Sequence, residues 1–420
     1  MTGSKTKDIM VLRDLAMKTM EIAKRDIQNE RRELWGDFHS MLTYKVPVYI
    51  LDVQSMWREV FNQNDLVCED PLFRIYENWF QLELYHSTFG DDHITEPWVC
   101  VRPIYEDGDS YIQKRTHWGI EISRERYADT LAMRYDDPFI NTLEDIKKIT
   151  TPSIKIDETK TKERFDIIQD AIGDIIDVQT DNSPDWLCGI SAMLGYMFNP
   201  QNLMMQFYDQ PDLVHKVAKL ISDEAIKLYD EYEKRGYLTN NDKTFLTFPQ
   251  LQAPTYSREL ISPGTQQKAS LKQLWNRGSA QEFEGVSPAF FDEYVMTYNA
   301  PILEKFGLSA FGCCENLTEM IKYIKRIKNL RRIAVTPWAD DEECAKQIED
   351  KYIISWRPNP AEMVANGLNA DRITKIIKNA KKIFNEYKCH WEINLKDFIT
   401  VEHDKSRLKN WVDIVRNALE

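Results

Sequence analysis

Two adjacent cysteines and a glutamate, Cys313, Cys314 and Glu315, directly follow a short apolar run in the stretch SAFGCCENLTEM. Neighbouring cysteines are a poor choice for a disulfide with each other. Thiolate and carboxylate groups are metal ligands, and a thiolate is also a nucleophile. The stretch is therefore either a metal or group-transfer site or two small side chains packed under a helix. Because adjacent side chains on an extended segment point opposite ways, we expect one of the two thiols to face such a site.

Other reactive side chains come where predicted strands end, and in a parallel barrel such positions meet at one mouth. Two strand-ending acids, two thiols and one ammonium would form a set for metal ligation or acid/base chemistry. Each residue alone has an ordinary explanation; Glu315, for example, suits the first turn of a helix. The cluster as a whole favours a functional site. The strand-end candidates besides the CCE trio are Glu282, Trp338, Arg357, Lys396, Asp397 and Thr400.

The last predicted strand has one apolar and one polar face. The outer face of a barrel strand is covered by helices and should be apolar, so the polar face should point inward, where unpaired charge is costly. An internal Lys–Glu pair and a ligand site are equal alternatives for these inward groups. The apolar face carries Trp391, Ile393 and Leu395, and the polar face carries Glu392, Asn394 and Lys396.

One arrangement that looks like a zinc site is rejected. Cys389, with His390 beside it, precedes its strand, whereas Cys313 follows its own. In a parallel barrel these positions lie at opposite ends, roughly 15–20 Å apart for strands of five or six residues. Cys389 is therefore expected to be structural.

The chain alternates predicted strands with predicted helices, most clearly in its last third, which favours a parallel sheet wrapped by helices. No Gly-rich phosphate loop follows any strand, as the alternative, a doubly wound open sheet, would require. We predict an α/β protein with a helical extension at 1–45 and a single (β/α)8 TIM-type barrel at 46–420. The expected strands are 46–53, 98–104, 175–181, 278–283, 306–312, 330–338, 352–360 and 390–400. The expected helices include 5–36, 199–236, 316–329, 339–350 and 369–387, with others starting at about 288 and 404.

Composition excludes several classes of partner. The net charge of −13 argues against nucleic acid and anionic membranes, which bind basic surfaces. The chain start lacks the apolar core of a signal peptide, and no run approaches the ~18 apolar residues of a membrane helix. The seven cysteines, an odd number scattered through the chain, suit a reducing cytoplasm.

Several stretches carry a family resemblance. Residues 278–315 read GSAQEFEGVSPAFFDEYVMTYNAPILEKFGLSAFGCCE, and AVTPW, SWRPNP and LKDFITVEHDKSRLKNW follow. Together they resemble the uroporphyrinogen decarboxylase superfamily, most of all its large bacterial branch related to corrinoid-dependent methyltransferases. The resemblance covers 278–420 well and 46–420 loosely. It implies a single (β/α)8 barrel with an N-terminal helical addition.

The resemblance also implies a metal site, with departures. Methyl-transferring relatives hold zinc on a His-x-Cys pair after one strand and a cysteine after the last strand, and a structural cousin, cobalamin-independent methionine synthase, adds a glutamate. Here Phe311 stands in place of the histidine, and Lys396 and Asp397 stand near the later cysteine's place. The ligands that the resemblance then implies are Cys313, Cys314, Glu315 and Glu282.

The implied activity is methyl transfer between a small methylated compound, or a thiol, and a corrinoid protein that docks over the barrel mouth. The metal would polarise the heteroatom leaving the methyl group. Glu282 or Asp397 would bind metal or shuttle a proton, Lys396 would keep a carboxylate charged, and Trp338 would wall the pocket. The remaining substrate-binding candidates are Arg357 and Thr400. A homodimer is left open.

Two alternatives from other classes stay open. One is a metal-free decarboxylase or lyase that works on a small carboxylated substrate by acid/base chemistry through Glu282, Lys396 and Asp397. The other is a binding protein without turnover. Uroporphyrinogen decarboxylation itself is disfavoured, because its polycarboxylate substrate demands arginines near the first strand and none precedes Arg58 there.

Overall fold

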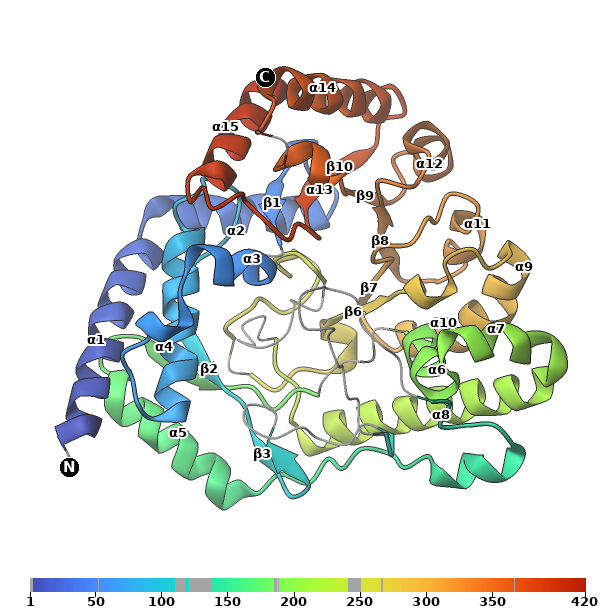
Figure 1. Ribbon diagram of the computed structural model, residues 1–420, viewed down its shortest axis with the longest axis horizontal. Coiled ribbons are helices and arrows are strands. Elements are labelled where there is room, and N and C mark those ends of the chain that lie inside the picture. Colours follow the sequence, from blue (N-terminus) through green and yellow to red (C-terminus); the bar gives the residue numbers. More distant parts are fainter. Residues whose placement is uncertain are drawn as a thin grey trace.

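A six-stranded parallel sheet forms one side of the protein and curves around its centre (Figure 1). The computed structural model describes residues 3–51, 53–109, 118–120, 137–184, 187, 189–240, 251–265, 267–365 and 367–420. In spatial order the strands are β1 (Val48–Ile50), β10 (His390–Leu395), β9 (Ile353–Trp356), β8 (Leu330–Val335), β7 (Leu308–Phe311) and β6 (Trp275–Gly278). Every neighbouring pair in this sheet is parallel.

Two smaller sheets complete the strands of the described residues. β2 (Trp98–Val101) pairs in parallel with β5 (Asp177–Thr180), and β3 (Ile104–Tyr105) forms an antiparallel hairpin with β4 (Gly108–Asp109). Within the described chain no ladder joins β1 to β2 or β5 to β6. The protein is thus a mixed α/β protein with a six-stranded parallel half-barrel, and the predicted (β/α)8 barrel is confirmed to that extent.

Side chains replace a neighbouring strand at the free edge of β1. The Asp92 carboxylate accepts a hydrogen bond from the Val48 N–H at 2.7 Å, and the Asp91 carboxylate accepts one from the Ile50 N–H at 3.0 Å. A buried backbone N–H needs a partner, and the two carboxylates supply it where a strand would otherwise pair. They account for the end of the ladder at β1.

Helices cover the outside of the half-barrel and extend the molecule at its N-terminal side (Figure 1). In the described parts of the chain, no helix combines the length and the apolar composition needed to cross a bilayer. The α-helices from residue 297 onward are α10 (Thr297–Leu303), α11 (Ile321–Ile324), α12 (Asp341–Ile348), α13 (Pro360–Met363), α14 (Ala370–Glu386) and α15 (Arg407–Leu419). The other helices are α1 (Gly3–Ala23), α2 (Asp26–His39), α3 (Val53–Val60), α4 (Pro71–His86), α5 (Glu158–Ile172), α6 (Ile190–Phe198), α7 (Pro200–Asp209), α8 (Pro211–Arg235) and α9 (Pro288–Phe290).

Several predicted boundaries are confirmed by their caps. The Ser287 hydroxyl accepts a hydrogen bond from the Phe290 N–H, and Pro288 occupies the first turn of α9. Gly236 ends α8 in the left-handed conformation, with φ of 69°. The predicted helix 199–236 is nevertheless two helices, because Pro211 starts a new one after Gln210.

Three other predictions are corrected. The strand expected at 278–283 lies earlier, at β6, and residues 281–283 form a 3₁₀ turn instead. The helix expected at 5–36 breaks between α1 and α2, and the helix expected at 316–329 has only one α-helical stretch, α11. Apolar residues of each predicted segment are still buried. Turns, however, interrupt the two expected helices and take the place of the expected strand at 281–283.

The inward face of β10 is polar, as predicted, and part of its hydrogen-bonding capacity is taken up by neighbouring groups inside the half-barrel, although Glu392 Oε2 and Asn394 Oδ1 have no partner among the described residues. Glu392 forms an ion pair with Arg332 of β8 and accepts a hydrogen bond from the Ser355 hydroxyl at 2.8 Å. The amide of Asn394 donates to the backbone carbonyl of Gln252 at 2.8 Å. The Lys–Glu pair considered above does not form, because Arg332 is the partner of Glu392.

Gly312, which turns the chain out of β7, provides a test of this packing. Its φ is +110°, and an added Cβ would lie 2.7 Å from the Cβ of Ala334 and 2.8 Å from Cδ1 of Leu317. Gly285 has a similar φ of +80° with no atom within 4 Å of such a Cβ. Both substitutions to alanine cost the strain of a left-handed backbone, about 1–2 kcal/mol. We expect Gly312→Ala to lose a further ~1–3 kcal/mol from overpacking, measured as the free energy of unfolding in urea. Equal losses in the two variants would contradict this account.

Candidate functional site

The carboxyl ends of β7 and β10 meet at one cluster, which we call the thiol site: Cys313, Cys314, Arg357, Lys396 and Asp397. β7 and β10 are separated by two strands in the sheet, so their ends come together because the sheet curves. The Lys396 ammonium lies 3.4 Å from the Cys313 sulfur and 3.2 Å from the Cys314 sulfur. The predicted convergence of strand ends at one mouth is therefore observed for these residues.

Both thiols face the site, which corrects the expectation that only one would. The two sulfur atoms are 3.5 Å apart, and both side chains are half-buried. Gly312 directly before them has a positive φ, so the segment is a turn and not an extended strand. The alternation of side chains that holds on a strand does not apply to a turn.

The two thiols differ in protonation. A hydrogen bond from Cys314 and the positive charges of Lys396, Arg277 and Arg357 hold the pKa of Cys313 well below the ordinary value of a thiol, although burial opposes this. The hydrogen bond to Cys313, burial and the charge of the Cys313 thiolate raise the pKa of Cys314. These opposite shifts of the pKa favour ionisation at Cys313 and retention of the proton at Cys314.

Asp397 gives the protonated thiol a second acceptor. Its Oδ2 lies 3.5 Å from the Cys314 sulfur and 3.1 Å from the Lys396 ammonium. The single proton of Cys314 can go either to the Cys313 thiolate or to this carboxylate. Asp397 is 49% exposed, so the arrangement connects the buried pair to solvent.

The ammonium itself is almost completely buried, with 5% of Lys396 exposed. Burial and the nearby Arg357 lower the pKa of Lys396, but the negative charges of Cys313 and Asp397 outweigh them, so the net shift of the pKa is upward. The shift favours the charged form of Lys396 in this site.

Arg357 and Gln252 close the thiol site from the inside. Arg357 donates one hydrogen bond to the backbone carbonyl of Cys313 and another to the side-chain oxygen of Gln252 at 2.8 Å. The Gln252 amide nitrogen lies 3.6 Å from the Cys313 sulfur. The prediction of Arg357 as a site residue agrees with this position. Gln252 was missed, because it comes from an irregular segment with no strand pattern around it.

Arg277, on β6, was also missed. Its guanidinium lies 3.4 Å from the Gly312 carbonyl, and its charge contributes to the low pKa of Cys313. The strand that carries it, WNRG, is short and fully buried. The predicted strand at 278–283 began where β6 ends, so Arg277 fell outside the list of strand-end residues.

Glu315 positions the thiol site from behind. One carboxylate oxygen accepts from the Cys313 N–H at 2.8 Å and the other from the Ala280 N–H at 2.7 Å. Burial and the neighbouring thiolate raise the pKa of Glu315. The two oxygens hold the backbone of the turns after β6 and β7 in place. Glu315 therefore fixes the position of the Cys313 backbone.

Three other predicted residues lie elsewhere. Glu282 accepts a hydrogen bond from the Ser191 hydroxyl of α6 at 2.7 Å. The Thr400 hydroxyl donates to Glu59 at 3.0 Å. The Trp338 side chain is 68% exposed. None of their described contacts joins them to the thiol site.

The rejected zinc pairing of Cys313 with Cys389 is indeed impossible in this fold. Cys389 is buried just before β10, with its sulfur 3.8 Å from the Ala345 carbonyl. The Nδ1 of His390 lies 3.0 Å from the backbone carbonyl of Thr43. Both residues are at the amino end of β10, opposite the thiol site.

The thiol site does not fit zinc as the donors are arranged. Zinc thiolates need the metal about 2.3 Å from each sulfur, yet the Lys396 ammonium bonds both sulfurs and Asp397 as well. The charges of Arg277 and Arg357 add to this positive surrounding. Among the described residues, no group of three or more His, Cys, Asp or Glu side chains is placed to hold a metal ion.

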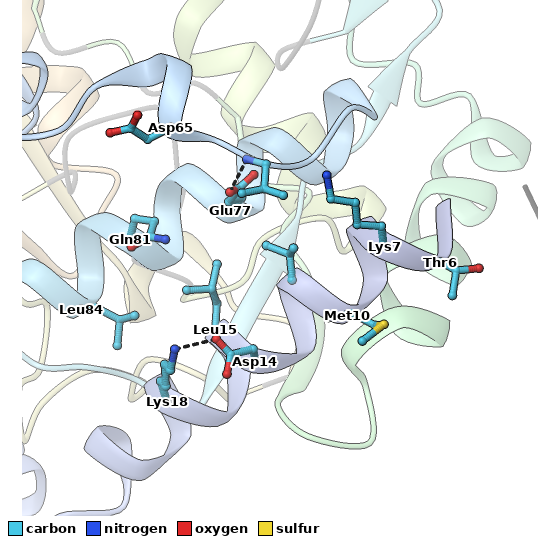
Figure 2. A pocket seen from close by; sticks show the side chains of 12 residues that line it. Thr6, Lys7, Met10, Asp14, Leu15, Lys18, Asp65, Glu77, Gln81 and Leu84 are labelled. Carbon is cyan, nitrogen blue, oxygen red and sulfur yellow. Dashed lines mark hydrogen bonds and ion pairs between the residues drawn. The ribbon is translucent and has the colours of Figure 1, made fainter. Parts of the chain in front are cut away.

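A hollow lies between α1 and α4, far from the thiol site along the chain (Figure 2). It is an open groove of about 670 Å³. Its acidic groups already have partners: Glu77 accepts from the backbone N–H groups of Val67 and Cys68, and Asp14 pairs with Lys18. The groove therefore offers no convergent reactive groups.

Comparison with known proteins gives no further assignment: the chain matches no protein-family model and no curated protein.

The role of Lys396 in holding the thiolate can be measured. Replacing the ammonium in Lys396→Met should raise the pKa of Cys313 by at least about one unit, because a charge pair at this distance is worth ~4 kcal/mol at an effective dielectric constant of 20. The rate of alkylation of Cys313 by iodoacetamide, followed by peptide mass spectrometry, should fall about tenfold at any pH below both midpoints. Lys409→Met removes an exposed lysine of α15 and serves as the control. An unchanged pH profile in Lys396→Met would refute the assignment.

Proposed function

We propose that this protein is a metal-free lyase or decarboxylase that acts on a small carboxylated substrate, with the Cys313 thiolate as general base. The observation that carries the proposal is geometric: the sulfurs of Cys313 and Cys314 lie 3.5 Å apart, and the Lys396 ammonium is within hydrogen-bonding distance of both. A base and an acid that are both cysteine side chains lie side by side at the carboxyl ends of the strands of a parallel half-barrel. Barrel enzymes place their reactive groups at this end.

Proton transfer suits this thiolate better than nucleophilic attack. Cys313 receives hydrogen bonds from Cys314 and Lys396, and Gln252 lies at 3.6 Å. Donors that stabilise a thiolate lower its nucleophilicity along with its pKa. The same donors keep the thiolate populated at neutral pH and place a replaceable proton next to it.

The cations of the site favour a substrate with a carboxylate. Arg357 is 2% exposed, and its Nε has no hydrogen-bond partner among the described residues. The described hydrogen bonds of the Arg357 guanidinium go to neutral oxygens. Among the described residues, no carboxylate accepts a hydrogen bond from it. A guanidinium holds a carboxylate by paired hydrogen bonds, and Lys396 adds charge on the other side of the thiols.

The elimination can be written with all protons accounted for. The Cys313 thiolate removes the proton from the carbon next to the substrate carboxylate, and the leaving group departs with the proton of Cys314. The site then holds a Cys313 thiol and a Cys314 thiolate. Transfer of one proton across the 3.5 Å between the sulfurs restores the starting state. In a decarboxylation, the bond from the substrate carbon to its carboxylate would break and release carbon dioxide, Cys314 would protonate the carbanion left behind, and Asp397 would deliver the replacement proton from solvent.

Methyl transfer, which the family resemblance implies, is the second candidate. The specific observation in its favour is that a half-buried thiolate, the softest nucleophile of the cluster, lies at the mouth. The Cys313 sulfur would attack the methyl carbon of a small donor, the bond from carbon to the heteroatom would break, and the heteroatom would take the proton of Cys314. The resemblance implies a corrinoid protein as the partner that receives the methyl group.

A substrate screen with a set of variants tests the proposal. We expect turnover of a member of a panel of small hydroxylated mono- and dicarboxylates, unaffected by EDTA and 1,10-phenanthroline. Cys313→Ala should lower kcat by about a thousandfold, because a general base contributes 10²–10⁴-fold. Arg357→Met should raise KM with a smaller change in kcat.

The control and the competing reaction have their own readouts. Cys389→Ala removes a thiol at the opposite end of the sheet and should leave kcat unchanged. Methyl transfer would add a methyl group to the Cys313 peptide when a methylated donor is supplied, detected by mass spectrometry. Activity that chelators abolish, or that survives in Cys313→Ala, would overturn the proposed mechanism.

A further inference from the structure

The two adjacent thiols differ from the other described cysteines in access and in ionisation. Cys68, Cys100, Cys344 and Cys389 are buried, whereas Cys313 and Cys314 are half-buried. Burial raises the pKa of Cys344 and of Cys389 to about 12 each. A thiolate within reach of solvent and next to a second thiol is the usual arrangement of a cysteine that reacts with peroxide.

We propose that Cys313 and Cys314 form a peroxide-sensitive pair, in which hydrogen peroxide oxidises Cys313 and Cys314 then closes a reversible disulfide between the adjacent residues. The geometry that carries this is the 3.5 Å separation of the two sulfurs, with the Lys396 ammonium on both and the Asp397 carboxylate on Cys314. No contact with a protein partner or a bound metal is required.

The first step oxidises Cys313. Its thiolate sulfur attacks one oxygen of hydrogen peroxide, the O–O bond breaks, and Cys313 becomes a sulfenic acid. The second oxygen leaves as hydroxide and takes a proton to form water. Lys396 lies 3.4 Å from the attacking sulfur and is placed to stabilise the charge on the departing oxygen.

The second step closes the bridge. Cys314 passes its proton to Asp397, 3.5 Å away, and its sulfur attacks the sulfur of Cys313. The S–O bond breaks, and the departing hydroxide takes a proton to form a second water. In total, the two thiols lose two protons and two electrons, and one hydrogen peroxide takes them up and is reduced to two waters.

The bridge is expected to be easily reduced. Consecutive Cα atoms are about 3.8 Å apart across a trans peptide, below the 4.4–6.8 Å of relaxed disulfides. Strain of this kind makes a disulfide more oxidising and more labile. The short distance between the two Cα atoms makes this pair unfit for a structural disulfide. It suits a disulfide that forms on oxidation and that a small thiol reduces again.

Oxidation would also remove the proposed general base. This regulatory consequence rests on the proposed function, because it requires Cys313 to act in catalysis. Formation of the disulfide itself rests only on the geometry of the thiol site. The two ideas can therefore fail separately.

The full-length protein is treated with a few equivalents of hydrogen peroxide at neutral pH, quenched with catalase and alkylated with iodoacetamide. We expect the intact mass to fall by two hydrogen atoms, with the peptide holding Cys313 and Cys314 unlabelled. Dithiothreitol added before alkylation should restore label on both residues. Oxidation of Cys313 to the sulfinic acid, or a bridge from Cys313 to another cysteine, would overturn the proposal.

Two variants separate the steps. Cys314→Ser should stop at the sulfenic acid, trapped by dimedone on Cys313. Lys396→Met should slow the loss of free thiol at least tenfold, while Lys409→Met should not. Because these readouts need no substrate, a disulfide that forms without affecting turnover would refute the proposed function alone. Turnover that depends on Cys313 without any disulfide would refute only this inference.

Discussion

A buried ammonium group needs negative charge beside it, and the arrangement of the thiol site follows from that need. Lys396 is 5% exposed and lies in the field of Arg357, which makes its charge harder to accommodate. The Cys313 thiolate and Asp397 are the groups that compensate it. Because Lys396 follows β10 and Cys313 follows β7, this contact also joins two strand ends that are not neighbours in the sheet. The charge of Lys396 is thus compensated by groups at two strand ends that the curved sheet brings together.

A second set of charged side chains lies deeper inside the half-barrel, where it is buried from solvent. Arg332 and Glu392 are almost completely buried and paired with each other, and Arg332 also donates to the Leu251 carbonyl at 2.6 Å. Removing one partner of such a pair costs about 3–5 kcal/mol, because the other charge is left uncompensated. The deep pair is therefore structural, and groups free to react are confined to the layer above it. This division explains why one inward strand face, that of β10, supplies both a structural residue and a site residue.

The sequence predicted the second half of the fold better than the first, for a physical reason. β7 to β10 alternate regularly with helices, and β8 and β9 carry apolar and β-branched residues, so periodicity and turn residues mark this half well. Strand-end reasoning on these elements found Cys313, Cys314, Arg357 and Lys396. β6 is a short strand without that pattern, and its misplacement put Glu282 on the list and left Arg277 off it. Gln252 could not be predicted, since an irregular segment reaches the site only through long-range packing.

The ammonium also explains how the site differs from what the family resemblance implies. In a zinc site, a metal ion would neutralise two thiolates and accept a substrate atom at an open position. Lys396 provides a positive charge to the same two sulfurs, while the hydrogen bond with Cys313 and burial raise the pKa of Cys314. An ammonium has no position for a substrate atom, whereas it can donate hydrogen bonds. An ammonium beside the two sulfurs therefore favours proton transfer over the Lewis-acid activation that a metal ion would supply, which is the basis for proposing elimination ahead of methyl transfer.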